Sequence, residues 1–254
     1  MHCDPGRASV CAGHEQEVIC VHNFMRRAVA LETRLRLDER HAQLLASQPA
    51  AASRRPGGPR TPLRGLTSPL PHREAGSEFN QTEVLRLHHR HETGLRARLW
   101  HGAQRANEAG GWGYRVEPLP RNLEALQSVR YEAPYGWYAE HVDTRFTWSR
   151  LNHTYSGRVI AAIVQLSDRH EHAGDYSGGE LQLVLRSGAV LDAPGCAGDA
   201  VFFPAAYLRH RVRHLRTGTR RNLVWWAKGK ARAATGSERG DTIKVHRVHS
   251  TVRV

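Results

Sequence analysis

A metal ion could bind at His141-Val142-Asp143, where an imidazole and a carboxylate stand two residues apart. On a β-strand, residues i and i+2 point to the same face, so both groups can converge on one cation. The spacing alone is a weak signal, because a chain with 17 His contains such pairs by chance, and His2-Cys3-Asp4 is a second one. Taken alone, the pair predicts only a surface contact.

Two residues further along the chain strengthen the metal interpretation: His210 in FPAAYLRHRV and Arg220 in TGTRRNLVWW. Two histidines and one carboxylate form the facial triad that suits non-haem Fe(II) and leaves coordination positions open. An Arg buried in the strand-like run that ends in Trp226 needs an anionic partner, because an unpaired buried guanidinium is very costly. A dicarboxylic cosubstrate would fit its planar fork. The His-to-Arg spacing also recurs by chance, so order and surroundings must decide.

Five segments supply that order: YEAPYGWYAEHVDT, RVIAAIVQLSD, DYSGGELQL, GDAVFFPAAYLRHRV and GTRRNLVWW. Together they resemble the 2-oxoglutarate- and Fe(II)-dependent dioxygenases, specifically the prolyl 4-hydroxylase-like branch. The resemblance covers roughly residues 100–227 and is more specific than either spacing, because several motifs recur in the same order. It implies a mainly β fold with N-terminal helices, namely a double-stranded β-helix or cupin-like jelly roll.

The resemblance also implies roles for five residues. His141, Asp143 and His210 would bind Fe(II). Arg220 would hold the distal carboxylate of 2-oxoglutarate, and Tyr131 would contact the same cosubstrate. O2 would be consumed and ascorbate would serve as reductant. No catalytic residue beyond the metal ligands is implied.

The activity that follows is hydroxylation of a substrate with release of succinate and CO2. The substrate stays open among a prolyl residue, an amino acid and a small metabolite, with PYGWY and LNHTYSG expected to shape its pocket. A noncatalytic metal- or ligand-binding jelly roll is the alternative from another class, and it predicts no succinate formation. An AlkB-like nucleic-acid demethylase is less favoured, because that family has a second Arg six residues after the first, where this chain has Trp226.

The net charge of +13, from 37 Lys and Arg against 24 Asp and Glu, first suggests a nucleic-acid partner. The basic residues are spread along the chain without a consecutive block, which favours a solvated surface. A basic nucleic-acid-binding module would show salt-sensitive DNA binding. We expect a small-molecule or a peptide or protein substrate, with neither nucleic acid nor membrane as partner. The oligomeric state stays open.

The elements that must position these residues follow from periodicity. Residues 1–46 are expected to form an N-terminal helical segment, residues 47–78 a disordered linker rich in Pro, Gly, Ser and Arg, residues 79–229 the dioxygenase domain, and residues 230–254 a basic polar tail. The helix within 23–46 would place Ala28, Leu31, Leu35, Leu44 and Leu45 on one face. Asn80 or Thr82 would cap a second helix that buries Leu95, Leu99, Ala103 and Ala106 and ends at Gly110-Gly111.

Seven strand-like runs follow within residues 123–227, as a sandwich or jelly roll requires. Leu181, Leu183 and Leu185 alternate with polar neighbours, which predicts a half-buried strand. Gly178-Gly179 would make the tight turn before it. Trp137, Trp225 and Trp226 are expected in the core or the pocket wall.

The compartment is expected to be the cytoplasm. The longest apolar run, Val159 to Leu166, is far below the roughly 20 residues that span a bilayer, and the N-terminus has no signal-peptide pattern. The cysteines are accordingly expected to be reduced. Cys3, Cys11, His14, Cys20 and His22 match no zinc-finger spacing.

Overall fold

The computed structural model describes residues 17–46, 82–88, 90–122, 124–143, 147–149, 154–170 and 174–230. The expected linker at 47–78 and the tail from residue 231 lie outside these ranges, as do Cys3, Cys11 and His14. Of the helices that are described, neither combines the length and apolar character needed to cross a membrane.

The described part of the chain is mainly β, with two helices, which confirms the predicted fold class. The elements in order are β1 (Ile19–Val21), α1 (Arg27–Ala46), β2 (Thr82–Leu87), α2 (Thr93–Ala109), β3 (Arg115–Val116), β4 (Leu126–Glu132), β5 (Tyr138–His141), β6 (Thr147–Ser149), β7 (Thr154–Gln165), β8 (Tyr176–Gly178), β9 (Leu181–Val184), β10 (Val190–Asp192), β11 (Ala200–Pro204), β12 (Arg209–Val212) and β13 (Leu215–Lys230).

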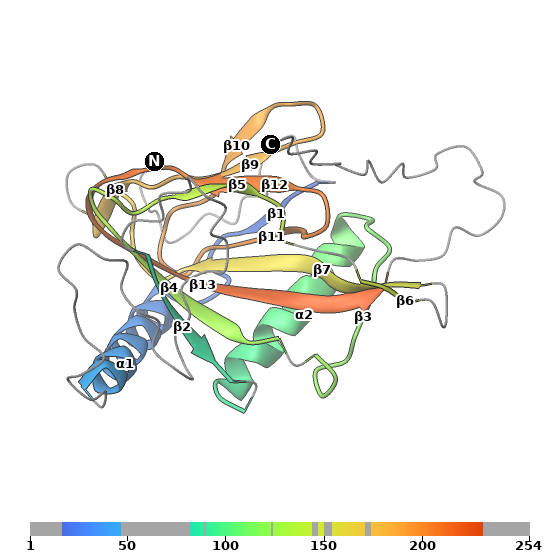
Figure 1. The fold of residues 1–254 in the computed structure, drawn as a ribbon, viewed down its shortest axis with the longest axis horizontal. Coiled ribbons are helices and arrows are strands. Elements are labelled where there is room, and N and C mark those ends of the chain that lie inside the picture. The colour runs from blue at the N-terminus through green and yellow to red at the C-terminus, as the bar shows by residue number, and fades with distance from the viewer. Residues whose placement is uncertain are drawn as a thin grey trace, which may run out of the picture.

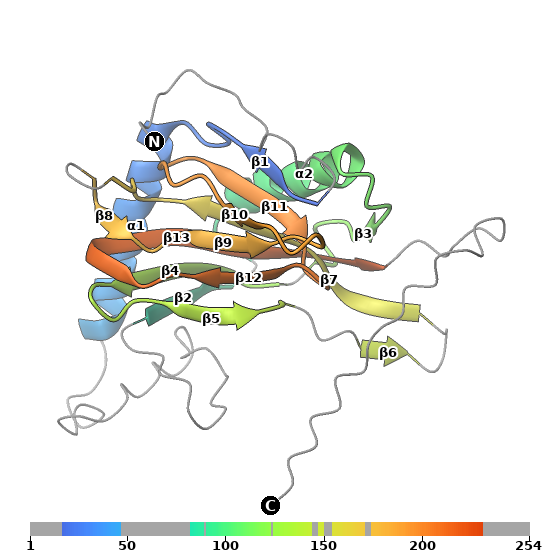
Figure 2. The same cartoon turned by 90° about the horizontal axis from the view of Figure 1, so that it is seen from above.

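Two antiparallel sheets face each other. The larger has the order β1-β11-β7-β13-β4-β2, with β3 and β8 also pairing with β13 and β6 with β7, and the smaller has the order β10-β9-β12-β5. Figures 1 and 2 show the smaller sheet over one face of the larger, with α1 and α2 against the other face. Two cores result, one between the helices and the large sheet and one between the sheets.

Alternation along β13 assigns its side chains to these cores. Leu223, Trp225 and Ala227 pack on the helix side, whereas Val224 and Trp226 pack between the sheets. Because successive strand residues point to opposite faces, the even-numbered Arg220 also points between the sheets. The same alternation confirms the prediction for β9, where Leu181 and Leu183 are buried and their neighbours are half-exposed.

The second helix is confirmed in its buried face and corrected at its start. Leu99, Ala103 and Ala106 are buried, whereas Leu95 is half-buried. Gly110 ends the helix by donating its N–H to Ala106 O over 2.8 Å. The helix begins at Thr93 with Glu92 as N-cap, not at Asn80 or Thr82. Thr82 instead starts β2, because TEVLRL can pair with β4 along its whole length.

The N-terminal helix is confirmed in position but not in orientation. Its buried residues are Ala30, Thr33, Leu37 and His41, whereas Ala28 is exposed and Leu35 is 59% exposed. The side chains of Leu44 and Leu45 lie outside the description. A different face of the helix therefore lies toward the sheet than the one predicted. Three charged residues of the helix, Arg27, Arg34 and Asp38, set this orientation because they pair with residues of the sheet region.

The segment before α1 also joins the fold. β1 pairs with β11, with Cys20 opposite Val201. Cys20 and Cys196 are both disulfide-bonded, which corrects the expectation of reduced cysteines.

Candidate metal centre and anion pocket

The two histidines of the predicted triad are direct neighbours in the small sheet. His141 is the last residue of β5 and stands opposite His210 of β12. Asp143 lies two residues beyond the end of β5, so the prediction that His141 and Asp143 share a strand is wrong. The backbone N–H of Asp143 donates to Ala205 O over 3.2 Å, and this bond holds Asp143 beside the two histidines.

Three ligand atoms converge at this point. His141 Nε2 lies 3.6 Å from Asp143 Oδ1, and His210 Nε2 lies 3.6 Å from Asp143 Oδ2. One ligand atom from each of the three residues falls within 4.8 Å of the others. The side chains of Asp143 and His210 are 7% and 5% exposed, while that of His141 is 28% exposed. The site is therefore open on the His141 side.

Backbone carbonyls orient both imidazoles. Nδ1 of His141 donates to Ala139 O over 2.8 Å, and Nδ1 of His210 donates to Leu208 O over 3.2 Å. With the proton on Nδ1, each Nε2 keeps its lone pair and can bind a metal. This arrangement is typical of histidines that ligate metals.

The ionisation of the triad suits a cation. Burial raises the pKa of Asp143, but attraction to the imidazoles of His210 and His141 outweighs it and lowers the pKa to about 2. Burial lowers the pKa of His210, against the attraction of Asp143. At neutral pH these two groups are thus a carboxylate and a neutral imidazole. Asp143 Oδ2 is buried and has no hydrogen-bond partner in the described structure, so the donor set fits Fe(II).

Aromatic and basic side chains surround the three candidate metal ligands. The ring of Tyr138 lies 4.1 Å from that of His141, and the ring of Phe203 lies 4.8 Å from that of His210. The guanidinium of Arg158 lies 3.7 Å from the Trp226 ring centroid and donates to Asp143 O over 3.4 Å. Trp226 belongs to the core between the sheets and Trp225 to the helix-side core, which agrees with the prediction of core or pocket-wall positions.

Arg220 is the second unusual group between the sheets. It is fully buried, and its Nε and both terminal nitrogens have no hydrogen-bond partner among the described residues. It stands opposite Tyr131 of β4 in register, with its guanidinium carbon 5.2 Å from the Tyr131 ring centroid. A buried cation without an acidic partner among the described residues predicts an anionic ligand, because the desolvation of its charge is otherwise poorly compensated.

Burial raises the pKa of Tyr131 and of Tyr176 above the ordinary phenol value, and the nearby charge of Arg220 opposes this only in part. Both hydroxyls therefore stay protonated at neutral pH and can donate hydrogen bonds to an anion. Tyr176 was not among the predicted site residues. It reaches the site because β8 pairs with β13, which places Tyr176 opposite Gly218.

Two further polar residues were missed. Gln165 and Asn222 are register partners on β7 and β13, both are buried, and Gln165 Oε1 and Asn222 Oδ1 have no hydrogen-bond partner in the described structure. Alternation places them on the same face as Arg220. The sequence signal was present: Gln165 lies inside the apolar run Val159 to Leu166, and Asn222 directly precedes the apolar run Leu223 to Ala227.

Of the remaining predicted positions, some agree with the structure and others lie outside the described residues. Gly178 and Gly179 have φ of 69° and 61°, which fits the predicted turn. Trp137 stacks on His214, with ring centroids 5.0 Å apart. In the segments expected to shape the substrate pocket, Tyr135 is 52% exposed, and the side chains of LNHTYSG before Gly157 lie outside the description.

Comparison with known proteins agrees with this geometry. Residues 126–228 match the family model of the 2OG-Fe(II) oxygenase superfamily. A prolyl-4-hydroxylase from Pseudomonas putida is similar in structure, with 15% identity, a TM-score of 0.50, and coverage of 86% of this chain and 94% of that chain. A prolyl hydroxylase from Trichoplax adhaerens, in complex with a hypoxia inducible factor oxygen degradation domain peptide fragment, has 13% identity, a TM-score of 0.56, and coverage of 84% and 83%. No curated protein matches the sequence. At these identities the solved structures show a shared fold.

Proposed function

Because residues 126–228 belong to the 2OG-Fe(II) oxygenase superfamily, we propose that this chain hydroxylates a substrate with Fe(II), 2-oxoglutarate and O2. One oxygen atom enters the product, and the other enters the succinate that forms as 2-oxoglutarate loses CO2. The observation that carries this proposal is a His-Asp-His triad in the same interior as a buried, unpartnered Arg220. A metal site alone would not need such a cation.

The residues divide the work of binding. His141, Asp143 and His210 would hold the iron, which supplies the oxidising chemistry when it is bound. Arg220 would pair with the distal carboxylate of 2-oxoglutarate, with Tyr131 and Tyr176 donating hydrogen bonds to the cosubstrate. No side chain is needed as a general base, because the reaction removes a hydrogen atom and not a proton.

The pocket walls contribute by excluding water. Phe203 and Trp226 are buried beside the triad, and Asp143 and His210 are nearly inaccessible. Excluding water from this interior would strengthen the polar contacts that hold the cosubstrate and would prevent side reactions. Access is left at His141 and the exposed Val142, which is 40% exposed, and this is where we place the substrate.

The substrate stays open among a prolyl residue in a peptide or protein, an amino acid and a small metabolite. A peptide is the first to test, since the Trichoplax adhaerens relative was solved with a peptide bound. Ascorbate as reductant is part of the proposal. The disulfide bonds of Cys20 and Cys196 argue against cytoplasmic localisation, because disulfides are rare in that compartment.

The test is anaerobic binding of Fe(II) and 2-oxoglutarate to the full chain, followed by succinate formation in air. Wild type should bind both and form succinate. Asp143→Ala should lose iron binding and turnover, and Arg220→Ala should bind iron normally but lose affinity for 2-oxoglutarate. Iron binding by folded wild type without 2-oxoglutarate binding or succinate would overturn the proposal in favour of a noncatalytic jelly roll.

A further inference from the structure

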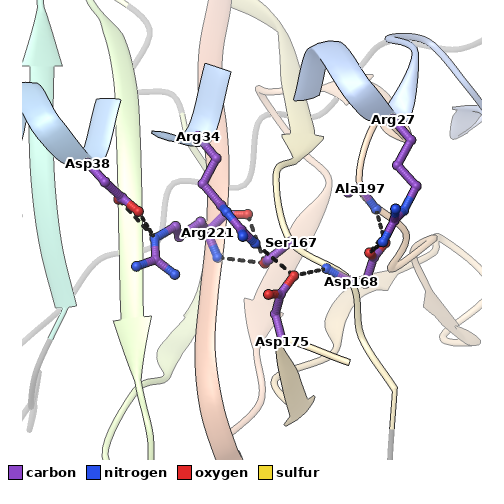
Figure 3. A network of polar contacts seen from close by, with 8 residues as sticks. All are labelled: Arg27, Arg34, Asp38, Ser167, Asp168, Asp175, Ala197 and Arg221. Atoms are coloured by element: carbon purple, nitrogen blue, oxygen red, sulfur yellow. Dashed lines mark hydrogen bonds and ion pairs between the residues drawn. The ribbon is translucent and has the colours of Figure 1, made fainter. Parts of the chain in front are cut away.

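Helix α1 contacts the sheet region through a row of charged side chains. Arg27, Arg34 and Asp38 point from one side of the helix toward the segment between β7 and β8 and toward β13 (Figure 3). Their partners are Asp168, Asp175 and Arg221. Two of these partners adjoin residues of the proposed cosubstrate pocket, since Asp175 precedes Tyr176 and Arg221 follows Arg220.

The contact at Arg221 fixes the strand that carries Arg220. Arg221 Nε lies 2.9 Å from Asp38 Oδ1 and 2.8 Å from Oδ2. The Arg221 N–H donates to Ser167 Oγ over 2.8 Å, and Arg221 O accepts the N–H of Leu166 over 2.9 Å. Side chains alternate along a strand, so holding Arg221 from the helix side sets where Arg220 enters the interior on the other side.

The contact at Asp175 fixes the backbone around Tyr176. Asp175 Oδ2 forms an ion pair with Arg34 at 2.8 Å and accepts the N–H of Asp168 over 2.9 Å. Asp175 O accepts the N–H of Thr219, the residue before Arg220, over 3.1 Å. One carboxylate residue thus connects α1 to both Tyr176 and Arg220.

We propose that α1 braces the cosubstrate pocket, with Arg34 and Asp38 as positioning residues for Tyr176 and Arg220. This inference rests on the proposed function. The guanidinium of Arg220 has no hydrogen-bond partner among the described residues, so its position before 2-oxoglutarate binds depends on the backbone that carries it. The side chains of the Arg34–Asp175 and Asp38–Arg221 pairs are 19–38% exposed, and ion pairs that solvent still reaches contribute only modestly to overall stability. Their effect should therefore appear in cosubstrate affinity, where preorganisation is decisive.

The experiment uses the full chain with Arg34→Gln, Asp38→Asn and a matched control, Arg36→Gln. Arg36 lies on the same helix and pairs with Glu92 at 2.8 Å, away from the pocket strands. Calorimetry measures 2-oxoglutarate and Fe(II) binding under anaerobic conditions. Succinate formation gives kcat and KM, and hydrogen exchange in the ligand-free protein reports on the amides of Thr219 and Arg221.

For Arg34→Gln and Asp38→Asn we expect the Kd and KM for 2-oxoglutarate to rise by about three- to thirtyfold. Iron affinity and kcat at saturating 2-oxoglutarate should stay within about twofold of wild type. Exchange at Thr219 and Arg221 should accelerate. Arg36→Gln should match wild type in every measurement, and Arg34→Lys should recover most of the lost affinity.

Unchanged 2-oxoglutarate affinity in both Arg34→Gln and Asp38→Asn would overturn the brace. Equal losses of iron and 2-oxoglutarate affinity, with a lowered Tm, would also overturn it, because that pattern indicates general loosening. If wild type itself binds iron but not 2-oxoglutarate, the proposed function fails first. The two failures are thus distinguishable.

Discussion

We propose that the charge of Arg220 is buried to bind a ligand and not to stabilise the fold. Its three guanidinium nitrogens have no hydrogen-bond partner among the described residues, and its side chain is fully buried. Replacing a poorly compensated buried charge with an apolar side chain often stabilises a protein by about 1–4 kcal/mol. We predict that Arg220→Leu raises the ligand-free free energy of unfolding by this amount while abolishing 2-oxoglutarate binding. Urea unfolding and calorimetry check the two effects.

Arg96 is the matched control for this exchange. It is also a buried arginine, but its guanidinium donates to Asn122 O over 3.0 Å. Arg96→Leu should therefore destabilise the protein by about 1–3 kcal/mol, because it removes a buried bond and leaves a carbonyl unpaired. If both substitutions destabilise equally, Arg220 has a structural partner and its assignment to a cosubstrate is wrong.

The individual residues of the site were only partly predictable from sequence. His141, Asp143, His210 and Arg220 were found through motif order, and the structure brings them into one interior. Tyr176 could not be found in this way, because only the pairing of β8 with β13 places it near Arg220. Sequence patterns record local periodicity, whereas this contact joins segments about forty residues apart in the chain, as a long-range strand pairing does.

At the scale of elements, the errors arose where two local patterns competed. TEVLRL follows polar residues that could cap a helix, yet it forms β2 because β4 offers a pairing edge. The buried face of α2 was predictable, since apolar residues repeat at helical spacing. That of α1 was not, because Arg27, Arg34 and Asp38 reach back to the sheet region and determine which side faces it. Ion pairs of this kind leave no hydrophobic periodicity to detect.

A glycine near the start of β13 gives a further prediction. Gly218 has φ of 75°, and a Cβ there would lie 2.0 Å from Asp175 O. Gly188 also has positive φ, at 86°, but a Cβ there meets nothing within 4 Å. Gly188→Ala should therefore cost only the left-handed strain of about 1–2 kcal/mol. Gly218→Ala should cost at least about 3 kcal/mol, because it also displaces the backbone of Asp175.

Denaturant unfolding of the two alanine variants isolates the backbone clash, since both pay the same conformational cost. The glycine comparison also bears on the pocket, because Asp175 O accepts the N–H of Thr219 beside Arg220. Gly218→Ala should weaken 2-oxoglutarate binding, and Gly188→Ala should not. Equal stability losses in the two variants would show that Asp175 moves aside freely, which a rigid brace would not allow.

For the molecule as a whole, the sheets and helices share one task. From Leu223 to Ala227, the face of β13 that meets the helices is apolar, and the opposite face of the strand carries Arg220, Asn222 and Trp226 toward the small sheet. The same strand thus anchors the core and presents the site. Several of the chain's basic residues serve this construction, since Arg27, Arg34, Arg158 and Arg221 each pair with an acidic residue.

Binding and stability should therefore be linked across the whole fold. A ligand that binds only the folded state stabilises it by about 2.7 kcal/mol at one hundred times its Kd. We predict that this much is gained by iron-loaded wild type with 2-oxoglutarate and that none is gained by Arg220→Leu. At the same 2-oxoglutarate concentration, a variant of Arg34 with tenfold weaker binding should gain about 1.4 kcal/mol less. Thermal unfolding over a 2-oxoglutarate series measures all three. A wild-type Tm that ignores 2-oxoglutarate would mean that the interior anion site does not take this dicarboxylate, however well the triad binds iron.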